Sequence, residues 1–311
     1  MNHVKNALWL GLPLAPLAPM VLSIVWAASA VACGGANDNL PPPPPPPPPP
    51  AASDSASVAP PVASATPPAA SSAAPPPAPP VTLTQGIASP DPAAPLPTVK
   101  ILAPTKDQII APDKAADFAI KLDVKNWKTA QGDAHVHLIL DDKPYKPIYD
   151  PKAPLKLSDL TGADALAPGQ HILVAFPSRA NHESVKTKGA VAITEFWIGK
   201  KGDKVQDTTK PLVIYSRPKG EYKGDMANHV LVDFQLTNDT LAADKDHVHI
   251  TVTGPGIDGE KAADATSFGA PFYLDNLQDG PYTVKVDLLG ADGKPLAGPW
   301  NSTTRSITIA H

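Results

Sequence analysis

Two stretches of sequence decide the fold: DFAIKLDVKN at residues 117–126 and HVLVDFQLTN at residues 229–238. In both, apolar and polar residues alternate with a period of two, which is typical of a β-strand with one buried face. The two stretches are 112 residues apart, and at the same offset HVH at 135–137 matches HVH at 247–249. At a slightly changed offset, Gly169 matches Gly280. The chain therefore contains an internal repeat.

Each copy of the repeat predicts about seven short strands, separated by turn signals such as Asn238-Asp239. No segment keeps the 3.6-residue period of an amphipathic helix. Short strands with regular turns are typical of an antiparallel sandwich. The sequence therefore predicts an all-β chain with two tandem antiparallel β-sandwiches, at residues 98–200 and 210–311.

The second copy also carries a family resemblance. In the block 273–286, a Leu-rich strand precedes a turn and Tyr282 begins the next strand. This block resembles bacterial immunoglobulin-like or fibronectin-III-like domains, which implies Ig-like sandwiches in both copies. His171 takes the place of Tyr282 in the first copy, so we expect it to be packed and hydrogen-bonded rather than a ligand.

The first 32 residues have the features of a signal peptide. Lys5 is followed by an uncharged, mostly apolar run from Ala7 to Ala32. The run is long enough to span a membrane, but prolines interrupt it and no basic cluster follows. Ordinary secretion, which would leave a free thiol at Cys33, is one outcome of such a segment.

The end of this run resembles a bacterial lipobox, the motif that signal peptidase II cleaves. It reads AVACGG at residues 30–35, and Cys33 is the only cysteine of the chain. Ala30 departs from the usual leucine of the motif. The resemblance implies that Cys33 is acylated and anchors the mature protein to a membrane. Gly34 stands where an aspartate would indicate inner-membrane retention, so the cell envelope, at the outer membrane, is the expected location.

A proline-rich segment follows. Residues 34–97 hold 23 prolines, three acidic residues and no basic or aromatic residue. Such a composition cannot bury enough apolar surface to offset its ordering entropy. We expect residues 33–97 to form a disordered, semi-rigid tether that reaches on the order of 100–200 Å if mostly extended.

The paired histidines are the candidate site. Residues i and i+2 of a strand share a face, so His135 and His137 point together, opposite the apolar Val136 and Leu138. The aliphatic face must be the core, which places both HVH pairs on outer sheet faces or at an interdomain contact. Two imidazoles can hold two corners of a zinc or copper site, and His182 is the candidate third ligand. The competing interpretation is a pair of solvated histidines.

Net charge and the motifs present limit the classes of function that the sequence supports. A net charge of −4 without a basic stripe excludes an electrostatic nucleic-acid binder. No phosphate loop, GxSxG elbow or HExxH motif is present, so we expect no enzyme. The sequence predicts a non-enzymatic surface or periplasmic lipoprotein that displays two Ig-like domains on a stalk, for adhesion, for protein or polysaccharide binding, or as an envelope spacer. The alternative is a copper- or zinc-binding envelope protein that uses the His-x-His strands.

Overall fold

A computed structural model describes residues 78–311, which lie within one compact unit. The described chain is all-β, as predicted, and its strands pair antiparallel except at two edge pairings. Among these residues no helix is long and apolar enough to cross a membrane. The predicted signal peptide, Cys33 and most of the predicted tether lie outside the described residues.

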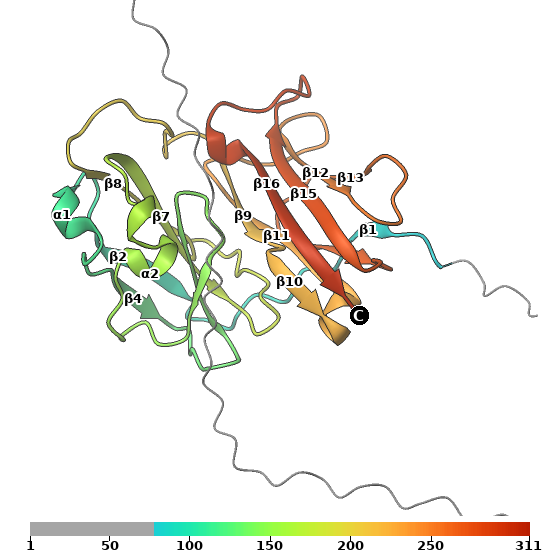
Figure 1. The fold of residues 1–311 in the computed structure, drawn as a ribbon, viewed down its shortest axis with the longest axis horizontal. Coiled ribbons are helices and arrows are strands. Elements are labelled where there is room, and N and C mark those ends of the chain that lie inside the picture. Colours follow the sequence, from blue (N-terminus) through green and yellow to red (C-terminus); the bar gives the residue numbers. More distant parts are fainter. Residues whose placement is uncertain (1–77) are drawn as a thin grey trace, which may run out of the picture. The chain divides into compact units, whose positions relative to one another are not determined.

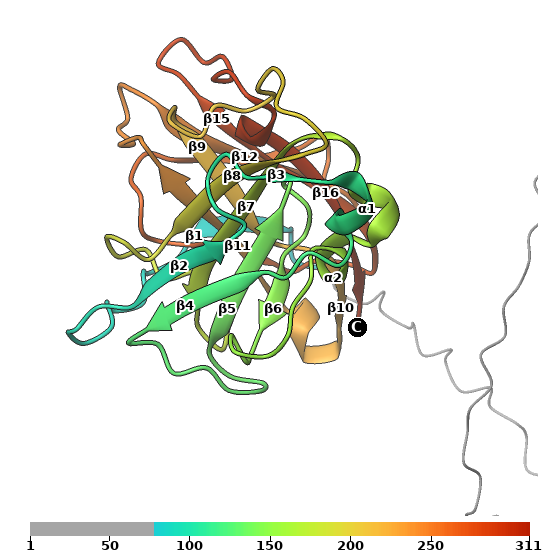
Figure 2. The same cartoon turned by 90° about the vertical axis from the view of Figure 1, so that its left-hand side faces the viewer.

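The first sandwich contains a two-stranded and a five-stranded sheet (Figures 1 and 2). The smaller sheet pairs β2 (Thr98–Ala103) with β4 (Lys121–Lys125). The larger sheet has the order β3 (Ile109–Ile110), β8 (Ala192–Ile198), β7 (Gly169–Ser178), β5 (His135–Leu140) and β6 (Lys146–Ile148). Short helical turns connect them: α1 (Pro112–Ala115), α2 (Ser158–Thr161) and η1 (Ala163–Ala165).

The second sandwich contains a four-stranded and a five-stranded sheet. The four-stranded sheet has the order β1 (Thr82–Gln85), β14 (Phe272–Asp275), β11 (His229–Thr237) and β9 (Leu212–Arg217). The five-stranded sheet has the order β10 (Gly220–Lys223), β16 (Ser302–Ala310), β15 (Gly280–Leu289), β12 (His247–Thr253) and β13 (Lys261–Ala265). Two 3₁₀ turns are present, η2 (Gly224–Ala227) and η3 (Pro299–Asn301).

The repeat seen in the sequence is a repeat of strand positions. β4, β5 and β7 occupy the places of β11, β12 and β15, and β3 and β10 both run parallel to the last strand of their sandwich. Asn126 and Asn238 end equivalent strands with φ of +57° and +58°, and each side chain donates to backbone carbonyls near the start of its own sandwich. The place of β14 holds only an isolated bridge in the first copy, between Ala119 and Lys156.

Strand β1 corrects the predicted extent of the tether. We expected residues 33–97 to be disordered, but β1 pairs antiparallel with β14 of the second sandwich. Figure 1 shows β1, in cyan, on the side of the orange strands and away from β2. Residues 81–85 (VTLTQ) form a proline-free run of β-forming residues, and Val81 is fully buried in the second core. A short run of this kind can close a sheet edge even though prolines flank it.

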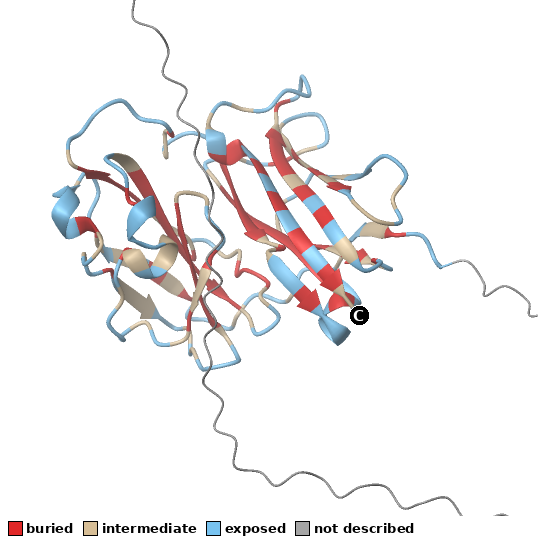
Figure 3. Cartoon of the chain, in the orientation of Figure 1, coloured by how far each residue is buried: buried red, intermediate tan, exposed pale blue. Residues whose placement is uncertain are grey.

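The two sandwiches differ in which of their sheets is covered on both faces (Figure 3). In the first it is the five-stranded sheet, and in the second it is the four-stranded sheet. Along β16, buried and exposed residues alternate, so one face of that sheet is open to solvent. Along β5 and β9, nearly every residue is buried, so both faces are covered. The covering layer is a cluster of apolar side chains between the two sandwiches, which we call the seam: Ile139, Tyr145, Ile172, Val174, Phe176, Leu212, Ile214 and Trp300.

Candidate metal centre at the seam

The strand phase predicted for His135 and His137 is confirmed. Val136 and Leu138 lie in the core of the first sandwich, and the two histidines lie on the opposite face of β5. That face is not solvated, because the second sandwich covers it: both histidines have 0% exposure. The contact is direct, since Nδ1 of His137 lies 3.0 Å from Oγ of Ser216 in β9. The interpretation as solvated histidines is therefore wrong for the first copy.

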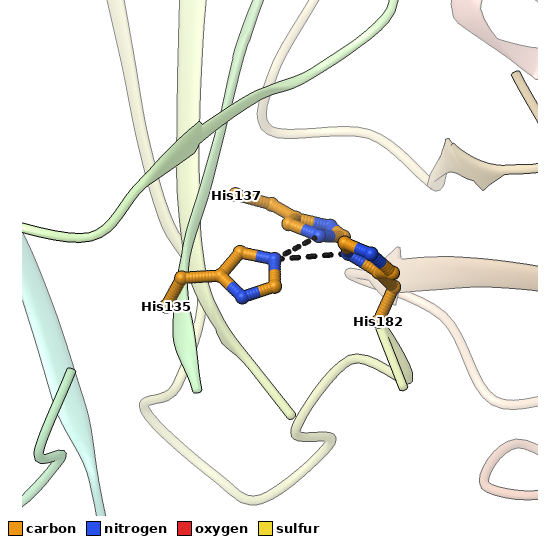
Figure 4. A group of neighbouring side chains, drawn as sticks. All are labelled: His135, His137 and His182. Atoms are coloured by element: carbon orange, nitrogen blue, oxygen red, sulfur yellow. Dashed lines mark hydrogen bonds between the residues drawn. The ribbon is translucent and has the colours of Figure 1, made fainter. Parts of the chain in front are cut away.

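His182 joins the pair (Figure 4). Its Nδ1 lies 3.0 Å from Nε2 of His135, and Nε2 of His137 lies 3.0 Å from the same atom. The candidate ligand atoms of the three residues all lie within 4.8 Å of one another. His182 belongs to the loop between β7 and β8 and has a φ of +68°, an uncommon conformation for a non-glycine residue. All three histidines named from the sequence are thus brought together.

Proton accounting shows that a metal-free cluster brings two nitrogen lone pairs face to face. Nδ1 of His135 lies 2.7 Å from the carbonyl oxygen of Asp133, which can only accept, so this nitrogen carries the proton. In the neutral ring, Nε2 then has a single lone pair and no proton. Two imidazole nitrogens approach that lone pair at 3.0 Å, but it can accept only one well-formed hydrogen bond. If it accepts from Nε2 of His137, Nδ1 of His182 can accept from the hydroxyl of Tyr145 at 3.2 Å, but its lone pair then faces that of His135 at 3.0 Å with no proton between them. A metal ion at this point would bind all three nitrogens at once.

The distances suit a transition metal. With metal–nitrogen bonds of about 2.0–2.1 Å, the nitrogens of a tetrahedral site stand about 3.3 Å apart. Two of the three separations are 3.0 Å, and the third is at most 4.8 Å. Small side-chain shifts therefore separate the present geometry from a three-histidine site with one open position. Imidazole ligands suit zinc and copper.

The protonation state also suits a ligand role. Burial, which disfavours the charged ring, holds the pKa of His137 well below its usual value and lowers the pKa of His135. Burial, with added repulsion from Arg217, His135 and Lys219, lowers the pKa of His182 to about 3. All three rings are therefore neutral at pH 7, the form that binds metals.

Two cations influence which ion would fit. Arg217 and Lys219 are half-buried beside the cluster, and within the described residues neither forms a salt bridge. Lys219 lies 4.2 Å from the ring centre of Tyr145, which stacks on His137 at 3.5 Å. Repulsion between a divalent ion and a cation about 8 Å away is about 4 kcal/mol at an effective dielectric of about 20. The site therefore favours a singly charged ion, or a divalent ion with an anion in the open position.

The second copy does not build such a site. His247 and His249 lie half-exposed on the open face of β12, and Nδ1 of His249 is 2.6 Å from the carboxylate of Asp264. Within residues 78–311, the three-histidine group at the seam is the only one with metal-ligand proximity. The same tripeptide thus has two environments, set by whether another sandwich covers its face.

The sequence analysis did not identify the polar residues that connect the two sandwiches at the seam. Asp141 and Asp142 follow β5 directly, and Asp142 accepts a hydrogen bond from Oγ1 of Thr303 and pairs with Arg305 of the second sandwich. Asp141 contacts Nδ1 of His171 at 2.6 Å, and this ring also donates from Nε2 to the carbonyl of Ala167. His171 is therefore packed and hydrogen-bonded, as expected. No sequence signal marks Asp142 as a contact residue.

Comparison with known proteins gives little beyond the fold. No family model matches the chain, and no curated protein sequence matches it. Solved structures with similar folds include the fibronectin(III)-like modules of Clostridium thermocellum CbhA, at 14% identity over 68% of this chain and 94% of that chain, with a TM-score of 0.23. The D00-D0 domain of intimin matches at 12% identity over 68% of this chain and 100% of that chain, with a TM-score of 0.24. At these TM-scores the likenesses carry no argument.

Proposed function

We propose that this protein is a lipid-anchored, non-enzymatic envelope protein that binds a zinc or copper ion through His135, His137 and His182. One observation carries the proposal: the unprotonated Nε2 of His135 lies 3.0 Å from a nitrogen of each of the other two rings. Without a proton between His135 and His182 two lone pairs face each other, and a shared metal ion would turn this contact into a favourable one. Three neutral histidines and an open fourth position match the ligand set of accessible zinc and copper sites.

The location rests on the sequence. The lipobox-like segment before Cys33 supports acylation at that cysteine, with the outer membrane as the destination. On this proposal, the proline-rich stalk carries the two sandwiches away from the membrane. Display for adhesion, for partner or polysaccharide binding, or as a spacer would use the same arrangement. Replacing Cys33 by serine should release the protein from the detergent phase, and a wild-type protein that is already soluble would contradict the lipid anchor.

Metal titration tests the binding function. Calorimetry with Zn²⁺ and with Cu²⁺ should show one site per chain in the wild type, and His182→Ala should weaken it at least tenfold. The variant His135→Ala/His137→Ala should lose the site. The matched control is His247→Ala/His249→Ala, which removes the equivalent pair of the second copy and should leave the affinity unchanged. Equal affinity in all four proteins, or no binding by the wild type, would overturn the proposal.

A further inference from the structure

Both sandwiches contribute to the surroundings of the three histidines. His135 and His137 lie on β5 of the first sandwich, and His182 lies on the loop at residues 179–186, which we call the His182 loop. Residues of the second sandwich hold this loop and one of the rings. We infer that the metal centre is assembled jointly, so that metal binding and docking of the two sandwiches are coupled. This inference rests on the proposed metal-binding function.

Ser216 of the second sandwich orients a ligand of the first. Its Oγ lies 3.0 Å from Nδ1 of His137, and both side chains are fully buried. When Nε2 of His137 binds a metal, Nδ1 carries the proton and donates it to Oγ of Ser216. Such outer hydrogen bonds fix the tautomer and the ring direction, and their loss typically weakens metal binding by about 10–100-fold. Ser216 is thus a positioning residue that reaches the site from across the seam.

The His182 loop is fastened to β11 of the second sandwich. The backbone N–H of Ser184 donates to Oδ2 of Asp233 at 3.1 Å, and the side chain of Gln235 donates to the carbonyl of Val185 at 2.8 Å. Asp233 also forms a salt bridge with Lys186. Asp233 and Gln235 are each 1% exposed, so these contacts are sheltered from water. The third ligand is therefore held in place by the second sandwich as well as by its own, where the hydroxyl of Tyr145 contacts Nδ1 of His182 at 3.2 Å.

The segment that leads from β1 to β2 fastens the other side of the same loop. Glu183, the neighbour of His182, accepts hydrogen bonds from the backbone N–H and the hydroxyl of Ser89. Arg179 donates to the carbonyl of Pro90 at 2.7 Å. Because β1 itself belongs to a sheet of the second sandwich, this segment ties the loop to that sandwich a second time.

These contacts have a thermodynamic consequence. A metal that needs the docked arrangement stabilises docking, and its apparent affinity falls in proportion to the fraction of molecules that are docked with the site correctly positioned. Ser216, Asp233 and Gln235 would not touch the ion. The effect of replacing them therefore separates a jointly built site from a site that belongs to the first sandwich alone.

Zinc titration of full-chain variants tests the coupling. We expect Ser216→Ala and Gln235→Leu each to raise the dissociation constant for Zn²⁺ by about tenfold or more, and Ser216→Thr, which keeps a hydroxyl, to restore most of the affinity. Ser306→Ala, an exposed serine of β16, is the matched control and should leave the affinity unchanged. In the wild type, Zn²⁺ should slow amide exchange in β9 and β11 of the second sandwich as well as in β5.

Two outcomes are distinguishable. If the wild type binds zinc, the variants bind it equally well and slower exchange is confined to the first sandwich, the coupling is wrong and the proposed function stands. If the wild type binds neither zinc nor copper, the proposed function fails and the coupling fails with it.

Discussion

The tripeptide His-Val-His occurs twice on equivalent strands, β5 and β12, and its two copies have opposite environments. In β12, the histidines lie on an open face, where His249 contacts Asp264 and His247 contacts the carbonyl of Lys245. In β5, the second sandwich covers the face, and the same side chains become buried, neutral and close to a third histidine. Local sequence sets which way a histidine points, and the neighbouring domain decides what it can bind.

The largest expected difference between the copies concerns the covered face. Ile139 in β5 and Thr251 in β12 occupy equivalent positions, but Ile139 is fully buried in the seam and Thr251 is half-exposed. Ile139→Ala should lower the free energy of unfolding by about 2–5 kcal/mol, because it leaves a cavity. Thr251→Ala should change it by no more than about 0.5 kcal/mol. Urea unfolding measures both, and equal losses would mean that the seam does not form in solution.

A smaller difference concerns His171 and Tyr282, which are the third residues of β7 and β15. Burial lowers the pKa of His171, but the hydrogen bond and charge of Asp141 outweigh it and raise the pKa above its ordinary value. The folded state then binds the proton more tightly, so the stabilisation is complete below the unfolded pKa of about 6.5 and is lost as the pH rises through the folded pKa. His171→Tyr should therefore cost about 1.5–3 kcal/mol at pH 5.5 and less at pH 8.

Tyr282 provides the control for that titration. Its hydroxyl donates to the carbonyl of Pro255 at 2.6 Å and accepts from the N–H of Gln278 at 2.8 Å. A phenol does not titrate between pH 5.5 and 8. Tyr282→Phe should therefore cost the same at both pH values. If the loss of stability in His171→Tyr is also the same at both pH values, the ion pair between His171 and Asp141 does not contribute to stability.

The smallest expected effect is one that the copies share. Asn126 and Asn238 both adopt the left-handed conformation, so replacing either by alanine should cost about 1 kcal/mol in backbone strain, and slightly more for the lost side-chain hydrogen bonds. Replacement by glycine removes the strain and should cost less. Thermal unfolding of the four variants measures these losses of stability. If the losses at Asn126 and Asn238 differ strongly, the two asparagines do not contribute equally to the stability of their sandwiches.

The period-two pattern was sufficient to predict the sandwiches and the phase of both His-x-His strands. The phase follows from local sequence, because a one-residue slip exposes every aliphatic side chain of the strand. His182 was named as the candidate third ligand because two histidines alone make a weak metal site. The position of His182 also depends on contacts between its loop and Asp233 and Gln235, which are 49 residues or more further along the chain. Contacts of that kind leave no periodic signal.

The sequence does contain a pattern that indicates the covered sheet faces at the seam. Ile172–Phe176 and Leu212–Tyr215 are continuous apolar runs rather than alternating ones, and such runs are typical of strands covered on both faces. Strand β1 was missed for a different reason. The composition of the whole segment 34–97 is dominated by proline, and an average over it conceals a five-residue run that can pair with a sheet edge.

The most direct measurement is a crystal structure of the protein with Zn²⁺, with anomalous diffraction recorded at the zinc edge. The account predicts one strong anomalous peak at about 2.0–2.1 Å from Nε2 of His135, Nε2 of His137 and Nδ1 of His182, and none near His247 and His249. A structure with no peak among the three seam histidines, or with zinc bound only on the open face of β12, would contradict it.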